Sequence, residues 1–169
     1  MKILDTERLT LRHLTPADAA FILELINEPG WITHIGDKGI RTEEGALAWM
    51  LSAPIPAYEK FGFGFYAVEL REGSAPLGIC GLVKRESLDD VDIGFAFLAR
   101  HWGRGYAREA AAAVLAYAFA TLKLERVVAI AAPAKTASRR LLEQIGLRYV
   151  DTRPLRGETR QSAYFTSDA

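Results

Sequence analysis

Hydrophobic and polar residues follow two periods along this chain, and the changes of period separate the expected strands from the expected helices. Residues 6–14 alternate with a period of two, which predicts a first strand. Thr15-Pro16 then begins a helix, because Thr is a favoured N-cap and Pro fits the first helical position. The apolar residues of this helix recur at helical spacing: Ala19, Ile22, Leu25 and Ile26. Glu28-Pro29-Gly30 should end the helix.

A segment with neither period separates this helix from the next one. Residues 31–41 contain Trp31 and two glycines but no regular pattern, so we expect a loop that borders a substrate pocket. Thr42-Glu43-Glu44 caps a second helix, which should end before Pro54.

Strands dominate the rest of the chain. Residues 62–70 and 77–84 predict a hairpin, and residues 91–98 predict a buried aromatic strand. A glycine-rich turn then leads into an alanine-rich helix that ends near Ala120. After this helix we expect a strand at residues 126–131 and a helix at 137–145. Residues 147–154 and 161–165 should form a last hairpin. The order β-α-α-β-β-β-α-β-α-β-β predicts a mixed α+β fold, and the length predicts one domain over residues 1–169.

The turn before the alanine-rich helix carries the clearest chemical signal. The first turn of a helix leaves its N–H groups unpaired at the positive end of the helix dipole, which favours an anion there. Gly103 and Gly105 allow the backbone to approach such an anion closely, and Arg100 and Arg104 add positive charge. The pattern therefore predicts a phosphate ligand.

Charge and cysteine content exclude several other classes of protein. Lys plus Arg and Asp plus Glu number 21 each, and this balance argues against a nucleic-acid partner. The one cysteine, Cys80, lies in an apolar run and is interpreted as a core residue rather than a nucleophile. No apolar stretch reaches about 18 residues, and residues 1–8 lack a signal-peptide core, so we expect a cytoplasmic protein without a membrane partner.

The motifs resemble one known family. Arg100-x-x-Gly103-x-Gly105-x-Ala107 is similar to the acyl-CoA pyrophosphate motif of the GNAT N-acetyltransferases. The opening Thr6-Glu7-Arg8-Leu9-x-Leu11-Arg12 resembles the ribosomal-protein alanine acetyltransferase-like (RimJ/RimL-type) subgroup of that family. The blocks around Ile93-Gly94-Phe95 and from Ser138 to Leu147 resemble the same subgroup. The resemblance covers essentially the whole chain.

The resemblance implies the GNAT fold, with a central, mixed and mostly antiparallel sheet of about six or seven strands and about four flanking helices. It also implies that two parallel strands, residues 91–99 and 126–132, splay apart to admit acetyl-CoA as co-substrate. Lys135 stands where members commonly carry an Asn that contacts the pantetheine arm. A dinucleotide site is the competing interpretation of the glycines, but the third glycine of that motif is missing. The implied cofactor-binding residues are Phe95, Phe97, Leu98, Arg100, Trp102, Gly103, Arg104, Gly105, Tyr106, Ala107, Lys135 and Ser138.

Acetyl transfer to an amine needs a base, because an amine is mostly protonated near neutral pH. Asp92 is the first candidate for this base, since related enzymes often carry a carboxylate before Ile-Gly on the central strand. A surface carboxylate without a role is the alternative interpretation of Asp92. Glu69, Glu86 and Asp90 are further candidates. A strand N–H near Phe97 is expected to stabilise the oxyanion that forms on the thioester carbonyl.

Ser138 matches a family position that contacts the cofactor and could protonate the departing thiolate, although helix capping is an alternative role. Tyr106 and Tyr164 are other candidates for this acid. The three histidines are scattered, so no metal site is expected. The residues expected to form or floor the acceptor side are Trp31, Trp49, Phe61, Phe63, Phe65 and Tyr66.

Together these observations predict an acetyl-CoA-dependent N-acetyltransferase that acts on a primary amine, either a protein N-terminus or a small molecule. Direct attack in a ternary complex requires no covalent enzyme intermediate. The alternative hypothesis is a non-catalytic acyl-CoA-binding protein with a regulatory or assembly role. The chain is expected to be a monomer or a homodimer, and the sequence leaves the acceptor and the general acid open.

Overall fold

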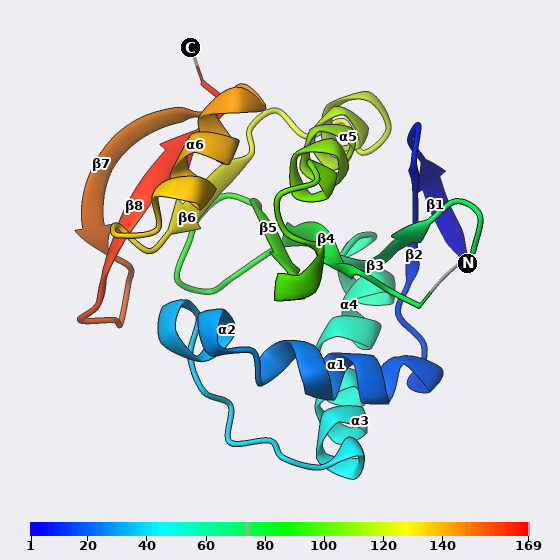
Figure 1. Ribbon diagram of the computed structural model, residues 1–169. Coiled ribbons are helices and arrows are strands. Elements are labelled where there is room, and N and C mark those ends of the chain that lie inside the picture. The colour runs from blue at the N-terminus through cyan, green and yellow to red at the C-terminus, as the bar shows by residue number, and fades with distance from the viewer. Residues whose placement is uncertain (74, 169) are drawn as a thin grey trace.

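One open sheet of eight strands organises the computed structural model, which describes residues 1–73 and 75–168 (Figure 1). The strand order is β1-β2-β3-β4-β5-β6-β8-β7, and every neighbouring pair is antiparallel except β5 and β6, which are parallel. The sheet is therefore mixed and mostly antiparallel, as expected, with one or two more strands than the six or seven predicted. The strands are β1 Lys2–Asp5, β2 Leu9–His13, β3 Phe65–Leu70, β4 Gly78–Val83, β5 Asp92–Phe97, β6 Val128–Ala131, β7 Arg148–Pro154 and β8 Gln161–Thr166.

Helices cover both faces of this sheet. Figure 1 shows α1 to α4 gathered below the sheet, and α5 and α6 above it. The helices are α1 Ala19–Ile26, α2 Pro29–His34, α3 Glu43–Ser52, α4 Pro54–Phe61, α5 Tyr106–Ala120 and α6 Thr136–Gln144, with short 3-10 turns at η1 Pro16–Asp18 and η2 Ala99–His101.

The alternation of side chains along the central strands builds two cores. Tyr66 and Val68 of β3 face the layer of α5, whereas Ala67 between them faces the layer of α1 and α3. In β4, Cys80 belongs to the first core and Ile79 to the second. Both strands are buried on both sides because each residue finds an apolar layer on its own face. The buried position of Cys80 confirms its interpretation as a core residue.

Helix α5 can lie close to β4 and β5 because its inner face is built mainly of small residues. Alanine also has the highest helix propensity, so the same composition favours the helix and its close packing. The buried residues of α5 are Ala110, Ala111, Val114, Leu115 and Ala118. This packing holds the N-terminus of α5 beside the end of β5.

Three elements were not predicted from the sequence. Strand β1 pairs with β2 although its four residues show no clear alternation. Helix α2 occupies the start of the segment expected to be a loop, and helix α4 begins at Pro54, where the second helix was expected to stop. Proline stands at the first turn of both helices, where its missing N–H costs nothing. The prolines were expected only to follow helix ends. Helices α1 and α3 do end before them, at Ile26 and Ser52, but each proline also begins the next helix.

None of the helices in the described part of the chain is long and apolar enough to cross a membrane.

Candidate active site

The parallel strands β5 and β6 meet at one end only. Asp92 pairs with Val128, and the Val128 N–H donates to the Val91 carbonyl at 3.0 Å. No further pair between these strands occurs in the described residues, so β5 and β6 diverge from this point. The splayed pair implied by the family resemblance is therefore present in the fold.

The register of β5 decides which backbone groups face the opening. The Leu98 N–H donates to the Leu77 carbonyl of the neighbouring antiparallel segment at 3.0 Å. Backbone groups point alternately to the two sides of a strand, so those of Phe95 and Phe97 point toward β6. Leu98 was expected to offer its backbone to a ligand, but its N–H is already bound on the other side. The Phe97 carbonyl accepts the Trp102 indole N–H at 2.8 Å.

The turn between β5 and α5 has the geometry of an anion cradle. Gly103 and Gly105 have φ angles of +79° and +81°, in the left-handed region that favours glycine. Gly105 is the N-cap of α5 and supplies no side chain to the first-turn N–H groups. Within residues 1–73 and 75–168, the N–H groups of Tyr106 and Ala107 have no hydrogen-bond acceptor. This arrangement fits a phosphate group.

The arginines around this turn differ in what they contact. The exposed Arg100 forms an ion pair with Glu24 of α1, so its charge is directed away from the turn. Arg8, which was not predicted as a site residue, donates to the Arg104 carbonyl at 2.9 Å and pairs with Glu109 at 2.7 Å. Arg8, Arg104 and Glu109 line a cavity of about 440 Å³ beside the N-terminus of α5.

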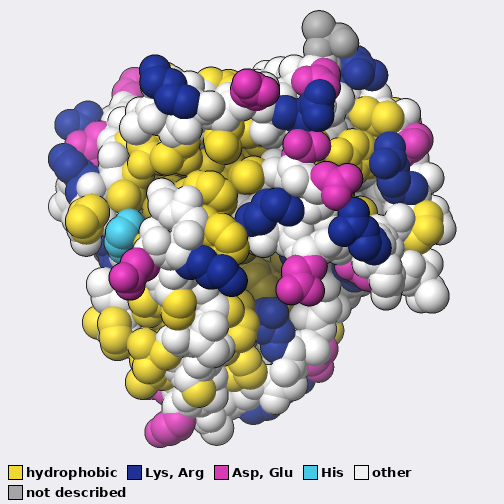
Figure 2. Space-filling model, turned by 180° about the vertical axis from the view of Figure 1, so that it is seen from behind, with side chains coloured by type: hydrophobic (Ala, Val, Ile, Leu, Met, Phe, Trp, Pro, Cys, Tyr) yellow, Lys and Arg dark blue, Asp and Glu magenta, His cyan; other side chains and the backbone are white. Residues whose placement is uncertain are grey.

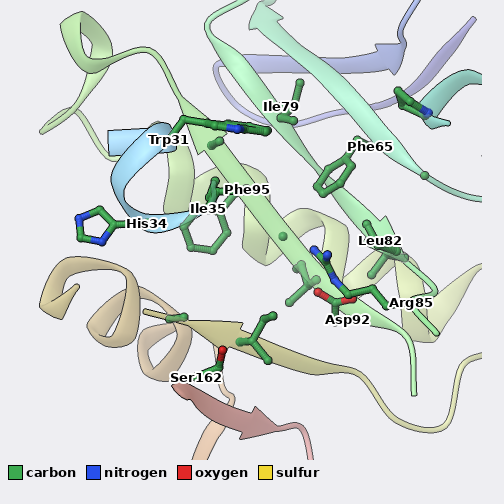
Figure 3. A pocket seen from close by; sticks show the side chains of 18 of the residues that line it. Trp31, His34, Ile35, Phe65, Ile79, Leu82, Arg85, Asp92, Phe95 and Ser162 are labelled. Carbon is green, nitrogen blue, oxygen red and sulfur yellow. The ribbon is translucent and has the colours of Figure 1, made fainter. Parts of the chain in front are cut away.

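A larger cavity of about 510 Å³ occupies the opening between β5 and β6. In Figure 3, Arg85 and Asp92 lie together at one end of this cavity, and His34 and Ile35 lie toward the other end. The face of the molecule seen in Figure 2 is hollowed near its centre, with hydrophobic side chains inside the hollow and Lys and Arg side chains around it. Five of the six aromatic residues predicted for the acceptor side line this cavity: Trp31, Trp49, Phe61, Phe63 and Phe65.

Tyr66 does not line the cavity as predicted. It is 1% exposed in the core and stacks on His13, with 6.0 Å between the ring centroids. Its position on β3 alternates with that of Phe65, which faces the cavity from the other side of the strand.

Asp92 is the predicted base that the fold brings into the cavity. Its side chain is 1% exposed, and its Oδ1 accepts from Arg85 Nε at 3.1 Å. Burial raises the pKa of Asp92 to about 6, and the charge and hydrogen bond of Arg85 oppose this rise. A carboxylate with this pKa is mostly ionised at pH 7 but is a better base than an ordinary one. The interpretation of Asp92 as a surface residue was wrong.

The other candidate carboxylates lie outside this cavity. Glu69 is bound to Arg12 at 3.2 Å, and Asp90 pairs with Arg126 at 3.6 Å. The residues that line the cavity include neither of these groups, nor Glu86.

Ser138 and Lys135 face the cavity from the β6 side. Ser138 lies in the first turn of α6, and Lys135 is the N-cap residue of that helix. Lys135 Nζ lies 5.8 Å from the ring centroid of Trp102, which is 54% exposed. Neither Tyr106 nor Tyr164, the two tyrosines considered as acids, lines the cavity. The Arg8 guanidinium carbon lies 4.6 Å from the centroid of the Tyr106 ring.

Lys38 and Arg85 also line the cavity, and neither was singled out from the sequence, although Lys38 lies in the segment 31–41 that was expected to border a substrate pocket. Their positions in irregular segments gave no periodic signal, and only the fold brings these segments together. The residues that the structure describes contain no group of three or more side chains able to hold a metal ion.

Comparisons with known proteins agree with this geometry. A family model for the acetyltransferase (GNAT) domain matches residues 8–148. The uncharacterized protein YkkB of Bacillus subtilis is 32% identical over 150 residues, which cover 87% of this chain and 86% of YkkB. The crystal structure of an acetyltransferase from Agrobacterium tumefaciens has a TM-score of 0.83 and 27% identity, and the match covers 100% of this chain and 95% of that one.

RimJ of Mycobacterium smegmatis, solved in complex with CoA-disulfide, has a TM-score of 0.77 and 21% identity. The match covers 94% of this chain and 80% of RimJ, and at this identity it shows a common fold. The comparisons confirm the resemblance carried by the sequence motifs, and for the RimJ/RimL-type subgroup they do so at the level of the fold.

Proposed function

The chain belongs to the GNAT family of N-acetyltransferases, and on this premise we propose that it transfers the acetyl group of acetyl-CoA to a primary amine by direct attack in a ternary complex. The observation that carries the proposal is the position of Asp92. This buried carboxylate, with a pKa raised to about 6, stands in the cavity where β5 and β6 diverge.

The co-substrate is proposed to enter from the wide end of the opening. The N–H groups at the start of α5 would bind its pyrophosphate, because they are unpaired and lie beside two glycines in left-handed conformation. The backbone groups of Phe95 face β6 and are available to the pantetheine amides, whereas the Phe97 carbonyl already accepts the Trp102 indole N–H. This path directs the thioester toward Asp92 and the closed end of the strand pair.

The chemistry then needs two protons removed from the acceptor nitrogen and one delivered to the departing sulfur. The Asp92 carboxylate takes a proton from the acceptor ammonium, directly or through water, and the free amine attacks the thioester carbon. The tetrahedral oxyanion is stabilised by a strand N–H, for which Phe97 is the candidate. The C–S bond breaks, the attacking nitrogen releases its second proton to solvent to give the neutral amide, and the thiolate takes a proton from solvent or from Ser138, which lines the cavity from the side of α6.

The proposal is tested by measuring thiol release from acetyl-CoA against a panel of amines that includes peptides with a free N-terminus. We expect turnover whose kcat/KM falls at low pH with an apparent pKa near 6, as Asp92 becomes protonated. Asp92→Asn should lower kcat/KM by about 10²- to 10⁴-fold and leave the Kd for acetyl-CoA unchanged. Asp89→Asn is the matched control, because Asp89 is exposed and binds Arg156 outside the cavity.

Two results would contradict the proposal. If acetyl-CoA binds but no amine is acetylated, the chain is an acyl-CoA-binding protein with a regulatory or assembly role. If Asp92→Asn retains full activity at every pH, Asp92 is not the base.

A further inference from the structure

The walls of the cavity beside Asp92 carry an excess of positive charge. Its acidic residues are Asp92 and Glu158. Its basic residues are Lys38, Lys84, Arg85, Lys135 and Arg160. Such a site is unusual for an enzyme that binds an amine, because the amine arrives as a cation.

Little of this positive charge is neutralised by the protein itself. Arg85 binds Asp92 through Nε only, which leaves its two terminal amino groups for another partner. Lys84 and Arg160 donate to backbone carbonyl groups rather than to carboxylates. Within residues 1–73 and 75–168, no carboxylate forms an ion pair with Lys38.

Lys38 and Arg85 influence each other across the cavity. The Lys38 ammonium lies over the Trp49 ring, with 4.8 Å between Nζ and the ring centroid. Partial burial, followed by the charge of Arg85, lowers the pKa of Lys38. An anion between these two cations would relieve both the repulsion and the loss of hydration.

A third hydrogen-bond donor stands in the wall of the same cavity. The Trp31 side chain is 8% exposed, and its indole N–H has no acceptor among the described residues. A buried donor without an acceptor costs free energy, and this fully buried N–H would meet a ligand oxygen only if the ring turned toward the cavity.

These observations restrict the acceptor. An amine with no other charge, or a polyamine, would bring further positive charge into the cavity, whereas a zwitterion brings none. The positive surroundings also lower the pKa of a bound ammonium, which helps Asp92 to remove its proton. The aromatic walls suit a small molecule with an apolar side chain, because the cavity of about 510 Å³ must also hold the end of the co-substrate.

We propose that the acceptor is a small amine that also carries a carboxylate, such as an apolar α-amino acid, and that Lys38 and the terminal amino groups of Arg85 bind this carboxylate. The inference rests on the proposed acetyl transfer and names the substrate class of that same site. The apolar part of the acceptor lies against the wall formed by Trp31 and Phe65.

The first experiment compares matched pairs of acceptors in the thiol-release assay. Phenylalanine is paired with phenethylamine and tryptophan with tryptamine, so that the members of each pair differ only in the carboxylate. Spermidine and a tripeptide with an amidated C-terminus complete the panel. We expect kcat/KM to be at least about tenfold higher for the carboxylate-bearing member of each pair, as hydrogen bonds to charged groups are worth that much.

The second experiment removes one charge from the site. Lys38→Met should raise the KM for phenylalanine by roughly tenfold, change the KM for phenethylamine little, and leave the Kd for acetyl-CoA unchanged. Lys60→Met is the matched control, because Lys60 also lies over an aromatic ring, Phe61 at 5.1 Å, but does not line the cavity. Unchanged acetyl-CoA binding shows that each variant is folded.

The outcomes separate this inference from the proposed function. Equal or better turnover of amines without a carboxylate, or of the amidated tripeptide, overturns the inference and leaves the acetyltransferase proposal intact. An unchanged ratio between phenylalanine and phenethylamine in Lys38→Met also overturns it. Binding of acetyl-CoA with no turnover of any amine overturns the proposed function itself.

Discussion

Replacing Asp92 by Asn should make the protein more stable relative to wild type as the pH rises, although it removes the proposed base. Burial raises the pKa of Asp92 from an ordinary value of 3.8 to about 6, despite the opposing contribution of Arg85. The native state therefore holds an ionised carboxylate in an unfavourable place at neutral pH. Asn has nearly the same shape and no charge, so it escapes this cost.

The magnitude follows from the two pKa values. One pKa unit corresponds to about 1.4 kcal/mol, so a rise from 3.8 to about 6 corresponds to ~3 kcal/mol. As the pH rises past 3.8 the unfolded chain loses the proton first, and the native state keeps it until about pH 6. The native state binds more protons in this window, so the stability of the wild type falls there and the loss is complete above pH 6.

The measurement is the free energy of unfolding from urea titrations at several pH values from 4 to 7.5. The difference between Asp92→Asn and wild type should shift by ~2.5 kcal/mol in favour of the variant over this range. A constant offset from the new contact between Asn and Arg85 does not affect this shift. Asp89→Asn is the control, because the exposed Asp89 has a pKa lowered by the hydrogen bond from Arg156.

The pKa of Asp89 in the control is shifted in the opposite direction to that of Asp92. A lowered pKa stabilises the native state above the ordinary value and loses this contribution as the pH falls, so Asp89→Asn should not gain on wild type as the pH rises. If the stability difference for Asp92→Asn stays constant from pH 4 to 7.5, Asp92 does not titrate near 6 and the argument for its role as a base fails.

Three further substitutions test the surroundings of the site. Gly103→Ala should weaken acetyl-CoA binding, measured by calorimetry, because alanine at φ +79° costs about 1–2 kcal/mol and distorts the turn. Gly73→Ala is the control: Gly73, at φ +84°, does not line the cavity, so this variant should lose similar stability with no change in the Kd. Tyr58→Phe should lower the free energy of unfolding by about 1–3 kcal/mol, because the Leu14 N–H loses its acceptor at 2.9 Å; an unchanged urea midpoint contradicts this. Glu109→Gln should destabilise by a similar amount in a thermal melt, because the carboxylate accepts two hydrogen bonds from Arg8, and a shift in melting temperature below 1 °C would refute the link.

The periodic segments of the chain were predicted well because local spacing determines them. The apolar stripe of α1 and the alanine-rich face of α5 are buried as the sequence indicates. The sequence correctly predicted that helices end before Pro29 and Pro54, but not that α2 and α4 begin at these prolines. Only the packing of the following residues decides whether a new helix forms there. Strand β1 was not predicted because its four residues show no pattern of their own, and only pairing with β2 makes them a strand.

The site was predicted less completely than the fold. The glycine turn lies within one segment, so its motif was visible in the sequence. Arg100 was predicted to serve this turn because it is a near neighbour in the chain, yet it pairs with Glu24, 76 residues away. Arg85 belongs to no recognisable motif, so its role in the site is visible only from its hydrogen bond to Asp92 in the folded chain.

The sequence by itself determined the order of the strands and helices other than β1, α2 and α4, the glycine cradle at the start of α5 and the family resemblance, because each depends on spacing over a few residues. The tertiary structure alone decided that β5 and β6 part after Asp92, that this carboxylate is buried with a raised pKa, and that Lys38 and Arg85 face one cavity. Desolvation and the mutual repulsion of cations arise only when distant segments exclude water from a common space, and no local pattern records them.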